Sequence, residues 1–168
     1  LGVAQGVMEL CQKINLNNLN IELHIFGDGP EKKQIENLIQ HPDNNKIFFY
    51  GMLNRSELHQ YLTKMDIAIV PLKTRIYGSV PSKIFEYGCL GFPILYFGGG
   101  EGEDIVKENQ LGWVANVGDF DDLNQKIFEI SKLNISEINA LKSACLKQST
   151  ATFDLDRQMN YLLQNDAF

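Results

Sequence analysis

The sequence has no apolar run that approaches the roughly 20 residues of a membrane-spanning helix. It is also poor in cysteine, since Cys11, Cys89 and Cys145 are odd in number and far apart. Thiols in that arrangement are typical of a reducing compartment, and they match the spacing of no metal site. We therefore expect a cytoplasmic protein in which all three thiols belong to the core and no metal is bound.

Basic runs are absent as well. The formal net charge is -6, from 15 Lys and Arg against 21 Asp and Glu. A chain without a basic patch is a poor partner for nucleic acid or for an anionic membrane surface. Small phosphorylated ligands stay possible, because they respond to local charge. The histidines, His24, His41 and His59, have no carboxylate or cysteine partner at a suitable spacing, so we expect them to be structural.

What the sequence does have is an alternation of strand-like and helix-like segments. Apolar runs of strand length lie at residues 21–26, 46–50, 66–72, 93–97 and 112–117. Helical segments lie at 7–14, 31–40, 55–65, 81–90, 104–109, 120–133, 136–148 and 153–164, with Asn54 and Asp119 as N-caps. This alternation predicts an α/β fold, a Rossmann-like doubly wound parallel sheet with helices on both faces and extra C-terminal helices.

The first helical segment follows a glycine turn at residues 1–6 and no strand. A parallel sheet normally begins with a strand. We therefore expect residues 1–168 to form one domain that is the later part of a longer polypeptide.

Glycine-containing loops follow the predicted strands at residues 27–29, 51, 71–81 and 97–102. The carboxyl ends of parallel strands share one edge of the sheet, and ligands of such folds bind beyond that edge. This edge is the predicted ligand site. The three glycines at 98–100 suit either a nest that cradles an anion or a flexible loop, and the sequence favours neither.

The helix near residue 81 has clear start and stop signals. Pro81 suits the first helical position, and Ser79 or Ser82 can cap the free N–H groups. Gly91 and Pro93 end the helix.

Three side chains on this helix form a candidate anion site. Ser82 and Glu86 are four residues apart and share one face, and Glu86 leans toward the helix start. Free N–H groups, the helix dipole and the Lys83 ammonium together favour a phosphate or diphosphate there. The alternative is an ordinary solvated face with a weak Lys–Glu pair.

Several stretches resemble the donor-binding half of two-domain glycosyltransferases of the GT-B fold, group 1 or family 4-like, in the branch that makes surface polysaccharides such as capsule and O-antigen. The resemblance covers essentially the whole chain, with its pieces in the family's order. These pieces are Pro81 to Tyr87 with Gly91 and Pro93, Gly102 to Val106, Gly27 to Pro30, Leu1 to Gly6, Gly112 with Val114, and Gly118 with Asp119.

The resemblance implies retaining transfer of a sugar from a nucleotide diphosphate sugar, a UDP- or GDP-sugar, to a polysaccharide or lipid-linked acceptor. The acceptor, and any contact with the inner face of the membrane, would belong to an N-terminal domain outside this sequence. No cofactor or metal is implied, and this domain alone would be inactive.

The resemblance also assigns roles to single residues. Glu86 would accept hydrogen bonds from the ribose, and Ser82 and Lys83, just after Pro81, would meet the diphosphate. The remaining donor-site residues are Met52 and Leu53 beside the base, Asp28 and Gly29 at the pocket border, and Gly2 in the first glycine loop. No catalytic residue is assigned. Gly78 departs from the family, in which a second glutamate eight positions before the ribose-binding one holds the donor sugar. The sugar contact would then come from the loop from Gly98 to Glu103 or from the N-terminal domain outside this sequence.

Three alternatives remain at this point. A nucleotide-sugar epimerase needs acid and base groups around a hexose, and few are offered besides Glu86, Glu101 and Glu103. A phosphoacceptor receiver domain needs an aspartate at the end of a middle strand, whereas Asp66 begins its strand. A degenerate, non-catalytic partner subunit would keep the fold without the donor, and Gly78 keeps that alternative open.

Overall fold

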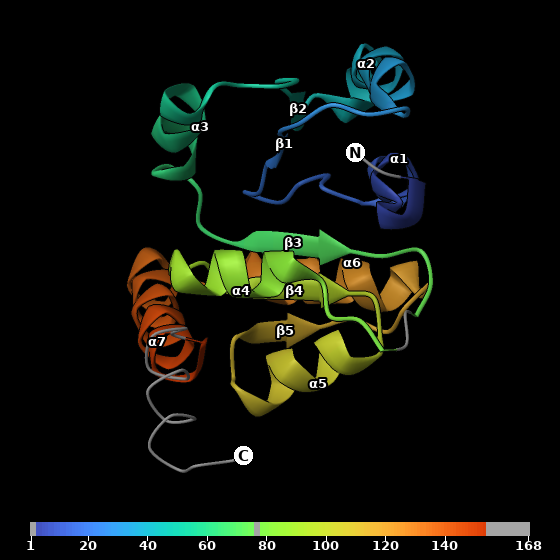
Figure 1. Cartoon of the computed structure of the whole chain (residues 1–168). Helices are drawn as coiled ribbons and strands as arrows, with labels where there is room; N and C mark the ends of the chain where they lie inside the picture. Colours follow the sequence, from blue (N-terminus) through green and yellow to red (C-terminus); the bar gives the residue numbers. More distant parts are fainter. Residues whose placement is uncertain (1–2, 76–77, 154–168) are drawn as a thin grey trace.

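The computed structural model describes residues 3–75 and 78–153, which form five short strands and seven α-helices (Figure 1). The strands are β1 (Leu23–Ile25), β2 (Ile47–Phe49), β3 (Ala68–Pro71), β4 (Ile94–Phe97) and β5 (Gly112–Val114). The α-helices are α1 (Val7–Lys13), α2 (Lys32–Ile39), α3 (Arg55–Leu62), α4 (Ser82–Cys89), α5 (Glu101–Glu108), α6 (Phe120–Ile130) and α7 (Ile135–Phe153). Two 3-10 turns, η1 (Val3–Gln5) and η2 (Pro42–Asn44), complete the described elements.

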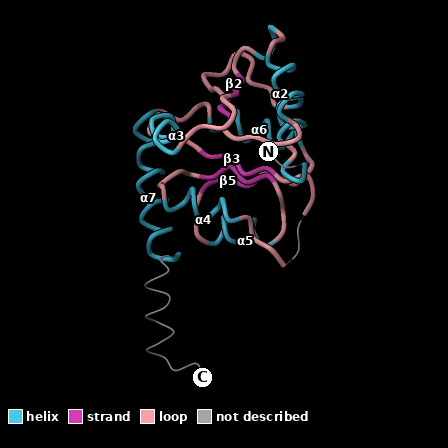
Figure 2. Tube along the Cα trace, turned by 45° about the horizontal axis from the view of Figure 1, so that its top comes forward, coloured by secondary structure: helices cyan, strands magenta, loops and turns pink. Residues whose placement is uncertain are grey.

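All strand pairs are parallel, and they form two separate ladders. β1 pairs with β2, with Leu23 opposite Ile47. β4 lies between β3 and β5, with Ala68 opposite Ile94 and Ile94 opposite Gly112. Figure 2 shows the strands between helices that lie on both sides. The α/β fold with parallel strands is thus confirmed, although the ladder is interrupted between β1 and β3.

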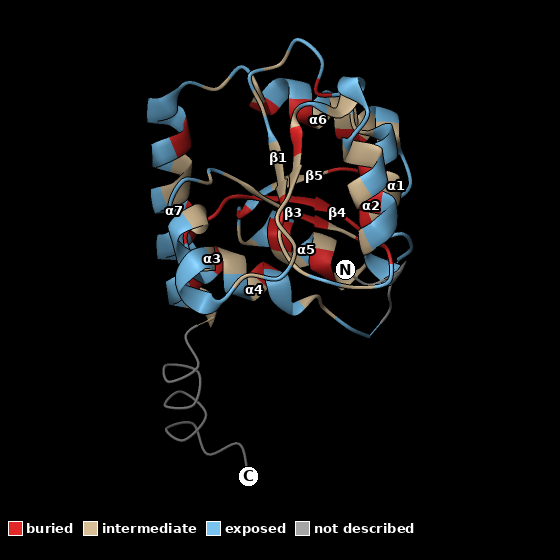
Figure 3. Cartoon of the chain, turned by 90° about the horizontal axis from the view of Figure 1, so that it is seen from above, coloured by how far each residue is buried: buried red, intermediate tan, exposed pale blue. Residues whose placement is uncertain are grey.

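Successive residues of a strand face opposite sides of the sheet, and both sides are covered. Leu95 and Phe97 of β4 pack with residues of α1 and α6. Ile94 and Tyr96 pack on the other side with Ile84 of α4 and with α5. Figure 1 shows α6 behind these strands and α4 in front of them, and in Figure 3 buried residues gather at β3 and β4. The chain is therefore doubly wound, with a core on each face of the strands.

Helix starts agree with the sequence at two places. Asn54 accepts a hydrogen bond from the Glu57 N–H at 3.0 Å, and the Glu57 carboxylate accepts one from the Asn54 N–H at 3.0 Å, which completes a capping box. Asp119 caps α6 through the N–H groups of Asp121 and Asp122.

Two helix predictions need correction. α5 begins at Glu101, three residues before the predicted start, because the helix starts directly after the glycine run. The predicted break between residues 148 and 153 is wrong, because α7 continues to Phe153. The rest of the helix predicted at 153–164 lies outside the described residues.

The strands are also shorter than predicted. The inner strands β1 and β3 begin two residues later than their apolar runs, at Leu23 and Ala68. Residues 21–22 and 66–67 precede the first ladder bonds, which run from the Leu23 N–H to the Lys46 carbonyl and from the Ala68 N–H to the Pro93 carbonyl.

The cysteines differ in exposure. Cys11 and Cys145 are buried, and burial raises the pKa of the Cys11 thiol to about 12. Cys89 is exposed, so the prediction of three core thiols is wrong for this residue. The Cys89 side chain lies on the solvent-facing side of α4, whereas the neighbouring Gly88 packs against α7.

Within the described residues, no helix combines the length and the apolarity that crossing a membrane would require. In the same part of the chain, no three His, Cys, Asp or Glu side chains are grouped closely enough to hold a metal ion.

Candidate functional site at the carboxyl edge of the strands

Loops that follow different strands contact one another at the carboxyl edge. The Gly27 N–H, after β1, donates to the Gly51 carbonyl, after β2, at 2.7 Å. The Gly78 N–H, in the loop after β3, donates to the carboxylate of Glu101, after β4, at 2.9 Å. Gly99 lies against Arg75 and Val117, so the loop after β5 joins the same group. At the predicted edge the loops therefore form two groups of contacting loops, one after β1 and β2 and the other after β3, β4 and β5.

α4 begins at this edge with its first N–H groups uncapped. Pro81 is the N-cap, with φ -60 and ψ 119, and Ser82 is the first helical residue. The prediction made Pro81 the first helical residue, whereas it is the N-cap and the helix begins one residue later. The predicted cap by Ser82 is also wrong, because its hydroxyl donates to Glu86 at 3.0 Å, and no side chain of the described residues caps the helix. The open N–H groups and the helix dipole are thus available to an anion.

The other end of α4 is fixed as the sequence predicts. Gly91 adopts φ +77, its N–H donates to the Gly88 carbonyl at 2.9 Å, and the Phe92 N–H donates to the Tyr87 carbonyl at 3.0 Å. These two bonds form a Schellman motif, which needs a left-handed residue at Gly91. The motif leads the chain directly into β4, and so fixes α4 relative to the edge of the sheet.

Glu86 reaches back one turn toward the start of α4. One carboxylate oxygen accepts from the Ser82 hydroxyl, and the other lies 2.5 Å from the Lys83 ammonium. The Lys83 hydrogen bond, with help from Ser82, holds the pKa of Glu86 below its ordinary value, and the same bond raises the pKa of Lys83. Both side chains are about half exposed. Near neutral pH, a carboxylate and an ammonium are therefore both charged and open to solvent beside the helix start.

The first turns of α4 and α5 differ in charge although both begin at the same edge. α4 has no acidic residue in its first turn, whereas α5 has Glu101, Glu103 and Asp104. Three carboxylates neutralise the positive end of the α5 dipole and repel an anion. A diphosphate is therefore better accommodated at α4 than at α5.

The chain matches the family model described as glycosyl transferases group 1 over residues 4–144. The chain belongs to this family. The match favours the glycosyltransferase interpretation over the epimerase and receiver-domain alternatives.

A curated relative of this group 1 glycosyltransferase chain is the amylovoran biosynthesis glycosyltransferase AmsK of Erwinia amylovora. The two sequences are 24% identical over 154 residues, and the match covers 89% of this chain and 37% of AmsK. Among solved structures, HepE of Anabaena in complex with UDP has a TM-score of 0.75 at 16% identity, over 98% of this chain and 46% of HepE. Sucrose-phosphate synthase of Thermosynechococcus elongatus also has a TM-score of 0.75, at 19% identity, over 98% of this chain and 43% of the synthase. The chain thus spans less than half the length of these relatives.

The other predicted donor residues of this group 1 glycosyltransferase chain lie in the neighbouring edge loops. Asp28 is exposed after β1 and accepts the Gly29 N–H at 2.8 Å. Met52 follows β2 with 75% of its surface exposed, and Leu53 beside it is half-buried. Gly2 lies outside the described residues. The residues expected beside the base thus follow β2, and those expected at the border of the donor pocket follow β1.

Glu101 belongs to the stretch from Gly98 to Glu103, which the sequence offered as one source of the sugar contact that Gly78 lacks, and it lies against Gly78. Its carboxylate accepts the Gly78 N–H, which lowers the pKa of Glu101, and its second oxygen is shielded from solvent without a hydrogen-bond partner among the described residues. Gly78 is the position at which the family resemblance leads us to expect a glutamate. A carboxylate therefore lies at this position, although it comes from α5. The local signal for it was an acidic residue directly after a glycine run.

The glycine run itself is a packed turn. Gly98 and Gly99 are buried, and the hydroxyl of buried Tyr96 donates to the Gly99 carbonyl at 2.9 Å. A Cβ at Gly98 would lie 2.9 Å from the Tyr96 ring. The packed turn over Tyr96 contradicts the flexible-loop interpretation, and the anion nest stays a prediction.

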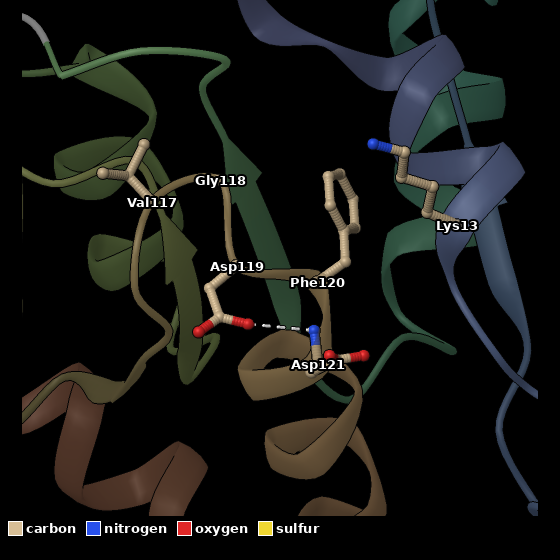
Figure 4. A pocket seen from close by; sticks show the side chains of 6 residues that line it. All are labelled: Lys13, Val117, Gly118, Asp119, Phe120 and Asp121. Carbon is tan, nitrogen blue, oxygen red and sulfur yellow. Dashed lines mark hydrogen bonds between the residues drawn. The ribbon is translucent and has the colours of Figure 1, made fainter.

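A shallow hollow of about 590 Å³ lies beyond β5, where α6 begins (Figure 4). The Asp119 carboxylate turns toward the α6 backbone there, and the Lys13 ammonium lies 4.6 Å from the centre of the Phe120 ring. These groups cap a helix and join α1 to α6. The hollow is thus explained by contacts within the protein.

For His24 and His41, the expected structural role agrees with the contacts of their rings, whereas the expected lack of a carboxylate partner is wrong. His24 contacts the Tyr50 hydroxyl at 2.9 Å and the Glu22 carboxylate at 3.1 Å, so it does have a carboxylate partner. Its ring also stacks on Phe48. His41 accepts the Asp43 N–H and caps η2. These two rings stabilise local structure.

Proposed function

We propose that this chain is the donor-binding domain of a two-domain retaining glycosyltransferase and that it holds the nucleotide of a UDP- or GDP-sugar. The ribose binds Glu86, the diphosphate binds the first turn of α4 with Lys83, and the base lies beside Met52 and Leu53. The observation that carries the proposal is the uncapped start of α4, where a carboxylate and an ammonium lie side by side. The structural similarity to HepE, whose structure was solved in complex with UDP, supports the choice of nucleotide.

In the free protein Glu86 and Lys83 form an ion pair with each other. Nucleotide binding separates them, because the ammonium moves to the diphosphate and the carboxylate accepts the ribose hydroxyls. Separating an exposed ion pair costs little free energy, because such a pair contributes less than about 1 kcal/mol to stability. A hydrogen bond from a ribose hydroxyl to the charged group contributes about 1.5–3 kcal/mol. The exchange therefore favours the bound state.

The donor sugar lies near Gly78, where Glu101 supplies the carboxylate that residue 78 lacks. Transfer then takes place between this domain and an acceptor-binding domain, with a polysaccharide or lipid-linked acceptor. No metal takes part, because Lys83 and the helix dipole neutralise the diphosphate. Turnover requires both halves of the cleft, so the domain alone is expected to bind donor without transferring sugar.

The test is calorimetric titration of the domain with UDP, GDP, dTDP and CMP. UDP or GDP is expected to bind, and Glu86→Gln is expected to weaken binding about 10- to 100-fold, which corresponds to about 1–3 kcal/mol. Glu108→Gln is the matched control, because it removes the same charge at the far end of α5 and should leave binding unchanged.

A degenerate partner subunit is the second candidate, and Gly78 is the observation that favours it. It predicts that no nucleotide binds to the folded domain. Glu101→Gln separates the cases further, because under our proposal it weakens binding of a UDP-sugar more than binding of UDP.

A further inference from the structure

Lys73 lies at the carboxyl end of β3, where the helices change from one face of the strands to the other. It follows Pro71, the last residue of β3, by two positions. Its N–H donates to the Ala4 carbonyl at 3.0 Å, in the turn that leads into α1. α1 packs on one face of β4 and α4 on the other. Ligands of doubly wound folds bind beyond the carboxyl ends of the strands at such a change of face. The place of Lys73 is therefore one at which a ligand is expected.

The carbon stem of Lys73 is packed on the glycine loop before α1. A Cβ added at Gly6 would lie 2.7 Å from Cγ of Lys73 and 3.3 Å from Cε. The lysine side chain still has 35% of its surface exposed. A lysine whose methylene groups pack on protein keeps its ammonium in contact with water. The stem is thus held in one place, and the charged end is accessible to a ligand.

A buried carboxylate sets the position of the ammonium. Only 9% of the side chain of Glu31, the N-cap residue of α2, is exposed. One of its oxygens accepts the Met8 N–H at 3.3 Å, and the other lies 3.8 Å from the Lys73 ammonium. The Glu31 carboxylate is thus fixed by the backbone of α1. A separation of 3.8 Å is too long for a hydrogen bond, so this contact leaves the donor hydrogens of the ammonium to a ligand.

Other basic side chains at this edge are engaged differently. Arg75 lies 3.9 Å from Glu103, beside the acidic first turn of α5. Lys83 and Glu86 form a close ion pair of two half-exposed side chains. Both phosphoryl groups of a nucleotide diphosphate are negatively charged, so a lysine with a carboxylate neighbour neutralises them only in part. A second ammonium at the same edge would strengthen the binding of a diphosphate.

We propose that Lys73 is a second cation of the donor site and binds the diphosphate from the side of α1, in addition to Lys83. This role rests on the proposed nucleotide site at α4. When the donor binds, Glu86 turns to the ribose, whereas Glu31 stays bonded to the Met8 N–H and keeps the Lys73 ammonium in place. The diphosphate is then held by groups that flank both ends of the loop between β3 and α4.

The test is calorimetric titration of the chain with UDP and GDP, at about 50 mM and about 500 mM NaCl. Lys73→Met removes the charge and retains a stem that can pack on Gly6. This variant is expected to bind the tighter nucleotide about tenfold more weakly at low salt and to lose much less at high salt, because salt screens the attraction between ammonium and phosphate. Lys73→Arg keeps the charge and is expected to retain most of the affinity.

Lys126→Met is the matched control. It removes an ammonium that lies 3.2 Å from Glu129 on α6, and it is expected to leave nucleotide binding unchanged at both salt concentrations. Unchanged affinity of Lys73→Met overturns the role of Lys73 and leaves the proposed function intact. An equal loss at both salt concentrations overturns it too, because the variant then acts through the structure. If the folded wild-type chain binds neither nucleotide, the proposed function fails, and the role of Lys73 fails with it.

A second measurement applies if Lys73→Met folds poorly. The wild-type chain is labelled with carbon-13 in its lysines, and the Cε signal of Lys73 is assigned by its loss in Lys73→Arg. Saturation with the tighter nucleotide is expected to shift this signal and to leave that of Lys126 in place. A Lys73 signal that does not move overturns the proposal.

Discussion

β3 and β4 are neighbours with similar apolar sequences, yet their surroundings differ. β4 is paired on both edges, and Ile94 and Tyr96 are fully buried in it. Among the described residues β3 is paired on one edge only, and its second edge lines a groove of about 670 Å³ between β1 and β3. In the part that contains β3, β4 and β5 with α4, α5 and α7, the β4 side is therefore closed by paired strands, whereas the β3 side is open to the groove.

The candidate site belongs to the closed part. α4 packs on α7 and, through the Schellman motif at Gly91, runs into β4. The residues expected to flank the base, Met52 and Leu53, belong to the other ladder across the groove. A closed core thus holds α4 in place, whereas the position of Met52 and Leu53 relative to α4 depends on how the two ladders are joined.

The largest contrast is expected between two isoleucines of these neighbouring strands. Ile94→Ala leaves a cavity in the closed core and is expected to lower the free energy of unfolding by about 4 kcal/mol. Ile69→Ala removes the same atoms from a half-buried site at the groove and is expected to cost about 1–2 kcal/mol. Urea denaturation followed by Trp113 fluorescence measures both. Equal losses would mean that the groove side is as closed as the core.

The junction of α4 and α7 provides the next test. Gly91→Ala places a Cβ at φ +77, 3.2 Å from Cβ of Leu146, and is expected to cost about 2 kcal/mol. Gly118→Ala is the matched control, because its φ is +78 and nothing lies within 4 Å of the added atom, so it is expected to cost only about 1 kcal/mol. Identical melting temperatures for the two variants would contradict tight packing at Gly91.

In the part that contains β1 and β2, the clearest local contribution is the capping box. Asn54→Ala removes the acceptor for the Glu57 N–H at the start of α3 and is expected to cost about 1 kcal/mol in chemical denaturation. Asn54→Asp keeps an acceptor and should retain most of the stability. If both variants lost the same amount, the hydrogen bond would not be the cause.

The smallest effect on stability is expected from the candidate site itself. The lowered pKa of Glu86 means that its contribution is present above the unfolded-state pKa and is lost as pH falls through the folded-state pKa. The raised pKa of Lys83 gives a contribution that is present below its unfolded-state pKa and lost as pH rises through the folded-state value. Since both groups are about half exposed, Glu86→Gln is expected to cost less than about 0.5 kcal/mol near neutral pH and nothing in acid. A loss as large as that of Ile94→Ala would make Glu86 a structural residue.

The sequence predicted what depends on local chemistry. The helix stop at Gly91, the caps at Asn54 and Asp119, and the approach of Glu86 to Ser82 all follow from residues within one helical turn. Contacts between distant segments were not predictable. The bond from Gly78 to Glu101 joins residues 23 apart, and the family resemblance offered the loop that holds Glu101 as only one of two possible sources of that contact.

Burial and helix ends were also only partly predictable. Cys89 lies in an apolar helical stretch, as Cys11 and Cys145 do, but its side chain lies on the solvent-facing side of α4. Residues 148–153 lack a strong breaker, so packing against α4 carries α7 through them. The interruption between β1 and β3 is a property of the assembled strands, which no single apolar run reveals.

The most direct test of donor binding at α4 is a nitrogen–proton correlation spectrum of the domain, recorded during titration with UDP and GDP. We predict that the amides of Ser82 and Lys83 shift most, together with those of Gly78 and Met52, and that Glu86→Gln removes these shifts. Shifts confined to the hollow around Asp119, or a spectrum of the folded domain that neither nucleotide changes, would contradict donor binding at this helix.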